Sequence, residues 1–264
     1  MRISIQLNKS VHENAALYFN KAKKAKKKLD GAKKALERSL SKLSRVEKKL
    51  AETEEPIIKT TPQKKEWYEK FRWFITSDGF LVIGGRDATT NEIIIKKHTL
   101  PDDIVFHTDM AGSPFFVIKS DSKEIPESTL KEAADATLTF SRAPAKGFSA
   151  MEVFYVKPEQ VSKNAPSGEY IKKGSFIIRG KTNYIKAKFN VAIGLKENKI
   201  ISGPVESVKK QTDNYVVLEL TDTNIKTSET AKKIQKVLGG GVLDEIIRAM
   251  PSAPVKVSQK RDQR

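Results

Sequence analysis

His107 and Asp109 are the side chains of this 264-residue chain whose types and spacing come nearest to acid–base chemistry. They alternate at the end of an expected strand, in FHTDMAG, so both side chains are expected on the same side. A catalytic pair would also need a nucleophile or a metal, and the other histidines, His12 and His98, fall in an expected coiled coil and at a helix end. We therefore expect no catalysis. A structural hydrogen bond is the simplest role for His107, followed by a contact to a phosphate or a ribose.

The turn Gly84-Gly85-Arg86-Asp87 is a candidate phosphate site. Asp87 is placed to cap a helix beginning at Ala88, so backbone amides and the Arg86 guanidinium would converge at one helix start. The turn is not a Walker loop, because no Gly-Lys-Ser/Thr follows it, and the glycines at 239–241 lack a flanking lysine of that kind. Nucleotide hydrolysis is therefore unsupported, whereas contact with an RNA phosphate stays open.

Two further clusters combine cations with a stackable ring. The first follows a glycine-flanked apolar strand and consists of Arg179, Lys181, Asn183 and Tyr184. Alternation predicts that its first three members project to one side, where they would supply phosphate donors beside the tyrosine ring. The alternative is a hairpin with an exposed polar face. The second cluster is Arg142 and Lys146 around Pro144, for which ordinary surface charge is the alternative.

The aromatic residues near position 70 are expected to lie mainly in the core. They are Trp67, Phe71, Trp73 and Phe74, of which we expect one or at most two to be exposed. Asp102 and Asp103 follow a proline in a turn, where they most simply close a loop. The residues predicted to bind RNA are Arg72, Arg86, His107, Arg142, Lys146, Arg179, Lys181, Asn183, Tyr184, Lys23, Lys24 and Lys27.

The elements that must position these residues form an expected α+β domain over residues 66–250. Hydrophobic patterns predict strands near 72–76, 80–84, 103–107, 115–119, 149–156, 175–179, 190–195 and 215–220, and helices at 88–98, 128–140, 228–238 and 243–249. Without a regular βαβ rhythm, a mixed and mostly antiparallel sheet is expected, with helices interspersed. The segment 251–264 is polar and basic, and we expect it to be disordered.

A basic coiled-coil arm is expected over residues 1–52, with a linker at 53–65. A heptad seam runs from Val11 to Leu50 with Ser39 as its polar member, which predicts a helix of about 60 Å that seeks a partner helix. Eight lysines lie between Lys21 and Lys34, and Lys23, Lys24 and Lys27 are among them. These lysines would act as point charges on RNA phosphates, or else form a solvated coiled-coil face.

Composition limits the partners and the chemistry. The net charge is +17 and the pI about 9.7, which favours nucleic acid or an anionic membrane surface as the partner. Cysteine is absent, so disulfides, thiolate catalysis and cysteine metal sites are excluded, and a cytoplasmic protein is expected. The sequence contains neither a signal-peptide core at its amino terminus nor a long apolar run, so we expect no secretion signal and no membrane span. We expect no cofactor and no metal.

Several long motifs resemble, in the same order, the RNA-binding (NFACT-R) domain of the NFACT family, which has archaeal, bacterial and animal members. The matching segments are residues 67–98, 102–119, 128–143 and 156–185, so the resemblance is specific over about 66–200. Residues 8–36 look like the start of the coiled coil that precedes this domain in archaeal members.

The resemblance implies binding to large ribosomal subunits that still carry peptidyl-tRNA, with contacts to tRNA or rRNA and a coiled coil reaching along the subunit. NFACT proteins recruit tRNA to extend the stalled chain or help to mark it for destruction. The NFACT-N domain, with its Asp-Arg pair for tailing, and the helix-hairpin-helix region do not appear in this sequence. We therefore expect no enzyme activity from this chain, and either a fragment of a longer protein or a stand-alone homologue.

Two alternatives stay open at this stage. The first is an oligomerising scaffold in which the heptad pairs two chains and the globular domain binds a protein partner. The second is an RNA-processing enzyme centred on His107 and Asp109.

Overall fold

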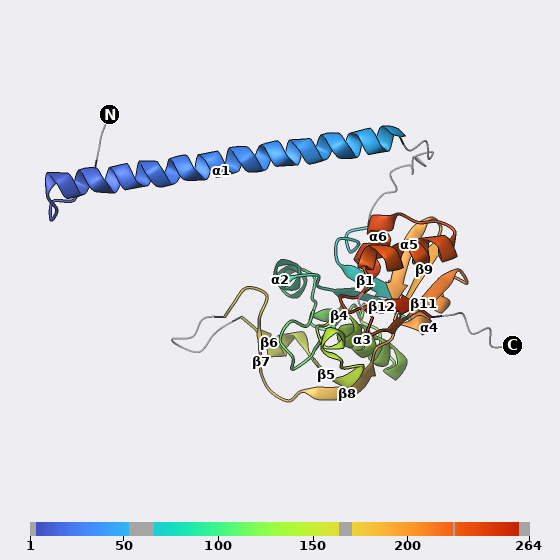
Figure 1. Cartoon of the computed structure of the whole chain (residues 1–264). Helices are drawn as coiled ribbons and strands as arrows, with labels where there is room; N and C mark the ends of the chain where they lie inside the picture. Colours follow the sequence, from blue (N-terminus) through green and yellow to red (C-terminus); the bar gives the residue numbers. More distant parts are fainter. Residues whose placement is uncertain (1–3, 53–65, 164–170, 224, 259–264) are drawn as a thin grey trace. The chain divides into compact units, whose positions relative to one another are not determined.

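The computed structural model describes residues 4–52, 66–163, 171–223 and 225–258, with side chains described in the arm as far as residue 44. The chain divides into two compact units, Met1–Lys64 and Lys65–Arg264, which are described separately (Figure 1). The predicted linker at 53–65 and residues 164–170 lie outside the described residues.

The first unit is a single long helix, α1 (Val11–Glu52), which confirms the helix predicted from the heptad pattern. Ser10 and Glu13 begin it with a reciprocal cap, because the Ser10 amide donates to the Glu13 carboxylate at 2.8 Å and the Glu13 amide donates to Ser10 Oγ at 3.3 Å. Seam residues described in this unit are exposed, for example Leu29 at 54% and Leu36 at 62%. The apolar seam therefore has no cover within the described part of the arm.

The second unit is built on a six-stranded sheet in the order β1-β2-β4-β3-β5-β8, all of whose pairs are antiparallel. Its strands are β1 (Arg72–Ile75), β2 (Leu81–Gly84), β4 (Phe116–Ile118), β3 (Ile104–His107), β5 (Ala150–Val156) and β8 (Asn183–Lys188). One face packs on α3 (Glu127–Thr139), whose Ala133, Ala136 and Leu138 are fully buried. The predicted α+β class is confirmed.

The other face of this sheet is covered over part of its width. It packs against α2 (Ala88–Lys97) and against the short ribbon of β6 (Val161–Ser162) and β7 (Ile177–Ile178). Phe115, Val117 and Phe154 lie in this second core with Ile94 of α2. Two short 3₁₀ turns, Pro144–Lys146 and Pro158–Gln160, lie on either side of β5 in sequence.

A second sheet has the order β10-β9-β11-β12 and joins the α3 side of the core. Its strands are β9 (Ala192–Lys196), β10 (Lys199–Gly203), β11 (Tyr215–Leu220) and β12 (Val255–Val257), and its helices are α4 (Val205–Lys209), α5 (Thr227–Leu238) and α6 (Leu243–Ala249). Ala231, Ile234 and Ile246 bury the inner faces of α5 and α6 in the core.

The prediction of a disordered segment at 251–264 is wrong for its described part. Val255–Val257 form β12, which pairs with β11 in the register Leu220↔Val255. Val255 is 3% exposed, and Thr230 Oγ1 donates to its carbonyl at 3.2 Å. The polar composition of the segment did not indicate this three-residue strand, whose buried valine is Val255.

Other elements also depart from the sequence expectation. The predicted strand 175–179 is reduced to two residues, and β8, β10 and α4 were missed. The β8 sequence NYIKAK buries Ala187 and half-buries Ile185, which is too weak an alternation to predict a strand. Its partner β5, rather than its own sequence, supplies the hydrophobic surface on which it pairs.

Candidate nucleic-acid interface

Strand register brings predicted residues from distant parts of the sequence into neighbouring rows of the six-stranded sheet. One row of paired residues runs across all six strands: Arg72, Gly84, Phe116, Phe106, Tyr155 and Asn183. Arg86 follows Gly84 by two residues, and His107 and Tyr184 lie in the next row through Phe154. Residues of six separate strands therefore lie in one row, and the sequence alone could not predict this register.

The glycines of the candidate phosphate turn have packing roles. A Cβ on Gly84 would overlap the Phe116 ring, and one on Gly85 would overlap the Asn91 side chain. That side chain accepts a hydrogen bond from the Phe115 amide at 3.2 Å, so α2 is fastened to β4 through this turn. Asp87 caps α2 as predicted, accepting from the Thr90 amide at 2.8 Å, and this hydrogen bond lowers the pKa of its carboxyl.

Arg86 is directed at backbone carbonyls. Its guanidinium donates to the carbonyl of Arg248 at 2.9 Å and to that of Phe71 at 3.0 Å. Burial, and then the charge of Arg248, lower its pKa. Although Arg86 keeps an exposed surface, the two donors are used to join the start of β1 to the end of α6. This geometry favours a structural role over the phosphate contact that the turn suggested.

Arg72 donates to the same carbonyl as Arg86. It lies over the Phe140 ring, with its guanidinium carbon 4.3 Å from the ring centre, and donates to the Arg248 carbonyl at 3.4 Å. Burial, and then the charge of Arg86, lower its pKa to about 10. Both guanidiniums thus meet the carboxyl end of α6, where backbone carbonyls carry partial negative charge. Among the described residues, neither lies within ion-pair distance of a carboxylate.

His107 has the contacts of a structural histidine. Nδ1 lies 2.6 Å from the Thr108 carbonyl oxygen, Nε2 lies 3.1 Å from the Ser113 carbonyl oxygen, and the ring stacks on Phe115 with centroids 4.2 Å apart. Burial lowers the pKa of the imidazole, although both carbonyls favour the protonated form. Both ring nitrogens face backbone within the fold, so the geometry supports the structural hydrogen bond that was the simplest reading.

The loop-closing role expected for Asp103 is confirmed, and it includes an ion pair that was not foreseen. The carboxylate accepts from the Leu100 amide at 2.7 Å and the Ser120 amide at 3.1 Å, and it pairs with Lys119. Lys119 also donates to the His98 carbonyl at 2.9 Å. With side-chain exposures of 9% for Lys119 and 1% for Asp103, this is a buried ion pair that ties the α2–β3 connection to β4.

The aromatic prediction is confirmed for all four rings. Phe71 and Phe74 are buried at 0% and 3%, Trp73 is half-buried, and Trp67 alone of the four is exposed, at 44%. Trp67 stacks on His98 with centroids 4.6 Å apart and planes at 15°. Burial, and then neighbouring lysines led by Lys70, lower the pKa of His98.

The expectation that Arg179, Lys181 and Asn183 share one side by alternation is wrong, because they do not lie on one strand. The chain leaves β7 at Ile178, turns at Gly180, where φ is +81°, and enters β8 at Asn183. Gln160 holds this turn by donating to the carbonyls of Arg179 at 2.9 Å and Lys181 at 2.8 Å. All three side chains are nevertheless exposed, as is Tyr184 at 48%.

The Arg142 and Lys146 patch lies at the other end of the β5–β8 ladder. Arg142 lies against Gly112 in the loop that follows β3, and Lys146 ends the 3₁₀ turn before β5. Because β3 and β5 are antiparallel, this loop runs beside the start of β5. Both residues are exposed. Sequence reasoning missed Lys186 and Lys188, which are exposed on β8, and Phe148, which is 49% exposed; the Lys-Ala-Lys alternation was the available signal.

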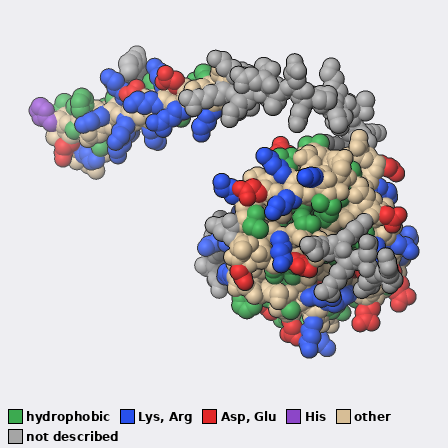
Figure 2. All heavy atoms as spheres, turned by 45° about the vertical axis from the view of Figure 1, so that its right-hand side comes forward, with side chains coloured by type: hydrophobic (Ala, Val, Ile, Leu, Met, Phe, Trp, Pro, Cys, Tyr) green, Lys and Arg blue, Asp and Glu red, His purple; other side chains and the backbone are tan. Residues whose placement is uncertain are grey.

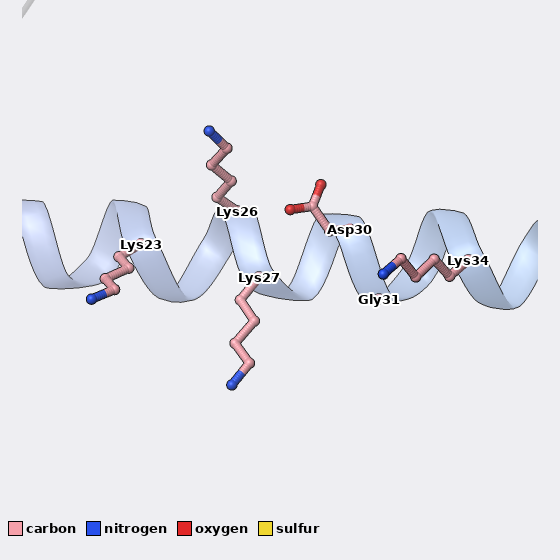
Figure 3. Close-up of a pocket in the computed structure, with 6 residues that line it drawn as sticks. All are labelled: Lys23, Lys26, Lys27, Asp30, Gly31 and Lys34. Carbon is pink, nitrogen blue, oxygen red and sulfur yellow. The ribbon is translucent and has the colours of Figure 1, made fainter.

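The lysines of α1 form the second basic surface. Lys23, Lys27 and Lys34 follow one side of the helix past Gly31, whose missing side chain leaves a shallow hollow with Lys26 and Asp30 at its margin (Figure 3). Residues four apart on a helix are separated by about 6 Å along the axis. In Figure 2, basic side chains line the described arm, whereas basic and acidic side chains are mixed on the visible face of the globular unit.

Within the described ranges, no cluster of three or more histidine or acidic side chains is placed to hold a metal ion. None of the helices described is both long enough and apolar enough to span a bilayer.

Comparison with known proteins gives a family match within the globular unit. Residues 70–180 match the family described as the NFACT protein RNA binding domain. The chain is 41% identical over 209 residues to the archaeal Rqc2 homolog aRqcH of Methanocaldococcus jannaschii, covering 76% of this chain and 31% of that protein. It is 45% identical over 129 residues to ribosome quality control complex subunit NEMF of Homo sapiens, covering 48% of this chain and 12% of that protein.

A third relative is ribosome quality control complex subunit 2 of Saccharomyces cerevisiae, 27% identical over 190 residues, covering 69% of this chain and 18% of that protein. The chain thus spans less than a third of the length of each of these three relatives. With the match over residues 70–180 and the likeness to these relatives, the chain belongs to the NFACT family, through its RNA-binding domain.

Proposed function

We propose that this chain is the RNA-binding module of a ribosome-associated quality control factor. The observation that carries the proposal is the match of residues 70–180, which hold the six-stranded sheet up to the turn before β8, to the NFACT RNA-binding domain. The names of the archaeal, human and yeast relatives add the quality control context. A cytoplasmic location follows from that role.

The partner that the proposal names is the large ribosomal subunit obstructed by peptidyl-tRNA, contacted through tRNA, rRNA or both. Two basic surfaces support it: the lysines of α1 around Gly31 and the exposed cations at the two ends of the β5–β8 ladder. Lysines act as point charges on phosphates, so both surfaces are suited to following a nucleic-acid backbone. Binding without catalysis is part of the proposal, since both ring nitrogens of His107 face backbone carbonyls and the ring is largely enclosed.

Co-sedimentation with purified large subunits, with and without peptidyl-tRNA, tests this role. We expect binding that saturates, that is stronger on obstructed subunits and that weakens as salt rises. Replacing Lys23, Lys24 and Lys27 by glutamine is expected to weaken it, whereas Lys232→Gln and Lys233→Gln on α5 provide a matched control of exposed lysines. Equal recovery with empty and obstructed subunits would contradict the partner proposed, and no recovery at low salt would contradict ribosome binding.

A second candidate function, a coiled-coil scaffold, is favoured by the exposed seam of α1. This function requires self-association that persists at high salt, because salt screens attraction between charges but does not weaken contacts between apolar seam residues. Analytical ultracentrifugation in low and high salt tests it: a monomer at both would exclude self-pairing through α1.

A further inference from the structure

The outer face of the β5–β8 ladder is open along β8 and over the start of β5. The side chains that project from it alternate along the two strands: Ala150 and Glu152 from β5, and Tyr184, Lys186 and Lys188 from β8, all of them exposed. Over β2, β4 and β3, the same side of the sheet is covered by α2 and the β6–β7 ribbon. Phe154 and Val156 of β5 are buried in that core, so the described part of the chain leaves open the start of β5, at Ala150 and Glu152, and the lysine-bearing strand β8 beside it.

Two exposed rings mark the ends of this face. Tyr184 is 48% exposed, and its ring is steadied by an edge contact with Phe154 at 6.2 Å between centroids. Phe148 is 49% exposed at the start of β5, where its amide donates to the Ala143 carbonyl at 3.1 Å. Four residues of strand separate the level of Tyr184 from that of Lys188, or about 13 Å. About four stacked nucleotides span that length.

The charge around the face favours an anion with repeating phosphates. Four exposed cations surround it: Arg142, Lys146, Lys186 and Lys188. Among the described residues, none of the four lies within ion-pair distance of a carboxylate, and the exposed acids nearby are Glu152 and Asp109. Exposed rings interleaved with unpaired lysines on a sheet are the arrangement by which sheet surfaces bind unpaired bases.

The edge of β8 argues against a protein strand as the occupant. Lys131 of α3 donates to the Lys186 carbonyl, and the Lys188 amide donates to Asp135 at 2.9 Å. Two of the backbone groups that an added strand would need, the Lys186 carbonyl and the Lys188 amide, are therefore already paired. The side-chain face stays open at the level where these two backbone groups are used.

We propose that the β5–β8 face binds single-stranded RNA, with a base stacked on Tyr184 and the backbone running past Lys186 and Lys188. This inference rests on the proposed function, which it narrows to one surface and to unpaired bases. Stacking on Tyr184 requires the ring but not its hydroxyl, so Tyr184→Phe should preserve binding that Tyr184→Ala loses.

The test measures fluorescence anisotropy of a labelled uridine oligonucleotide of about ten nucleotides, beside an RNA duplex of the same length and tRNA. For Tyr184→Ala we expect roughly tenfold weaker binding to the single strand, the size typical of one stacked base. Lys186→Gln with Lys188→Gln should flatten the slope of log affinity against log salt by about 1.4. Tyr184→Phe, and Lys232→Gln with Lys233→Gln, should bind as the parent does.

The outcomes separate this inference from the function on which it rests. If the parent chain binds tRNA or duplex while the Tyr184 and lysine variants bind the single strand like the parent, the inference is overturned and the proposed function stands. Binding of duplex but not of the single strand overturns it as well. If the parent binds none of the three probes, both proposals fall. Tryptophan fluorescence melts of each variant check that the globular unit stays folded.

Discussion

Replacing Arg86 by alanine separates the two roles that can be given to this residue. Its guanidinium donates to the carbonyls of Phe71 and Arg248, and this joins the start of β1 to the end of α6. Removal leaves the Arg248 carbonyl with the longer contact from Arg72 at 3.4 Å. A phosphate-binding Arg86 would change RNA affinity and leave stability alone, whereas this geometry predicts the reverse.

The expected magnitude follows from the two hydrogen bonds. A hydrogen bond to a charged group contributes about 1.5–3 kcal/mol. Two such bonds would contribute about 3–6 kcal/mol, and because Arg86 keeps an exposed surface we expect about half of that, roughly 1.5–3 kcal/mol for the two together. For a unit of about 200 residues, this corresponds to a fall in melting temperature of roughly 3–12 °C. Arg86→Lys, which can reach one carbonyl, should fall between alanine and the parent.

Thermal melts followed by tryptophan fluorescence suit this measurement, because both tryptophans, Trp67 and Trp73, lie in the globular unit and α1 contributes no signal. Lys232→Ala, an exposed cation on α5, is the matched control and should melt like the parent. RNA affinity is measured well below the melting temperature. An unchanged melt together with a tenfold loss of affinity for tRNA would refute the structural assignment and restore the phosphate role.

Three other perturbations test separate parts of the account. Lys119→Met leaves the buried Asp103 carboxylate without its counter-ion, so the free energy of unfolding measured in urea should fall by about 3–5 kcal/mol. A fall below about 1 kcal/mol would mean that the pair is not buried in solution. Gly84→Ala places a methyl group against the Phe116 ring and should lower the free energy of unfolding by about 1–3 kcal/mol. Gly31→Ala on α1 should leave the melting temperature of the globular unit unchanged. Equal melting temperatures for the two variants would contradict the packing at the turn. Burial lowers the pKa of His107 below its ordinary 6.5, so the unfolded chain binds more protons, and stability should be complete above about pH 7 and fall as the pH drops through 6.5. In urea titrations at several pH values, His107→Gln should reduce the loss of unfolding free energy at low pH. The part that remains is due to His98, whose pKa is also lowered. A loss as large as in the parent would contradict a buried His107 with a lowered pKa.

Local sequence signals predicted the elements that carry their own hydrophobic pattern. The heptad predicted α1, and the Asp87 cap predicted the start of α2, because each signal lies within the residues concerned. Strands rich in buried apolar residues, such as β2 and β4, were likewise predictable. The burial of Phe71 and Phe74 followed from ring size alone.

What the sequence could not predict depends on contacts between distant residues. The edge strand β8 depends on β5 and α3, and β12 depends on β11 and Thr230. The direction of the Arg86 guanidinium is set by the carbonyl of Arg248, which lies 162 positions further along the chain. From the sequence alone, a cation at a glycine turn was therefore a reasonable candidate to bind phosphate. In the folded chain the Arg86 guanidinium donates to a backbone carbonyl.

The exposure of Lys186, Lys188 and Phe148 on one side of the globular unit was not predicted, for a related reason. Lysine is common on surfaces, and only the register with β5 shows that these side chains share an open face with Tyr184. Conversely, the predicted grouping of Arg179 and Lys181 with Asn183 assumed one continuous strand, and the turn at Gly180 interrupts it.

The measurement that tests the central claim most directly is the affinity of the intact chain for tRNA across a salt series. The account predicts saturable binding whose log affinity falls linearly with log salt, with a flatter slope when Lys23, Lys24 and Lys27 become glutamine. Absence of saturable binding at low salt would contradict an RNA-binding module.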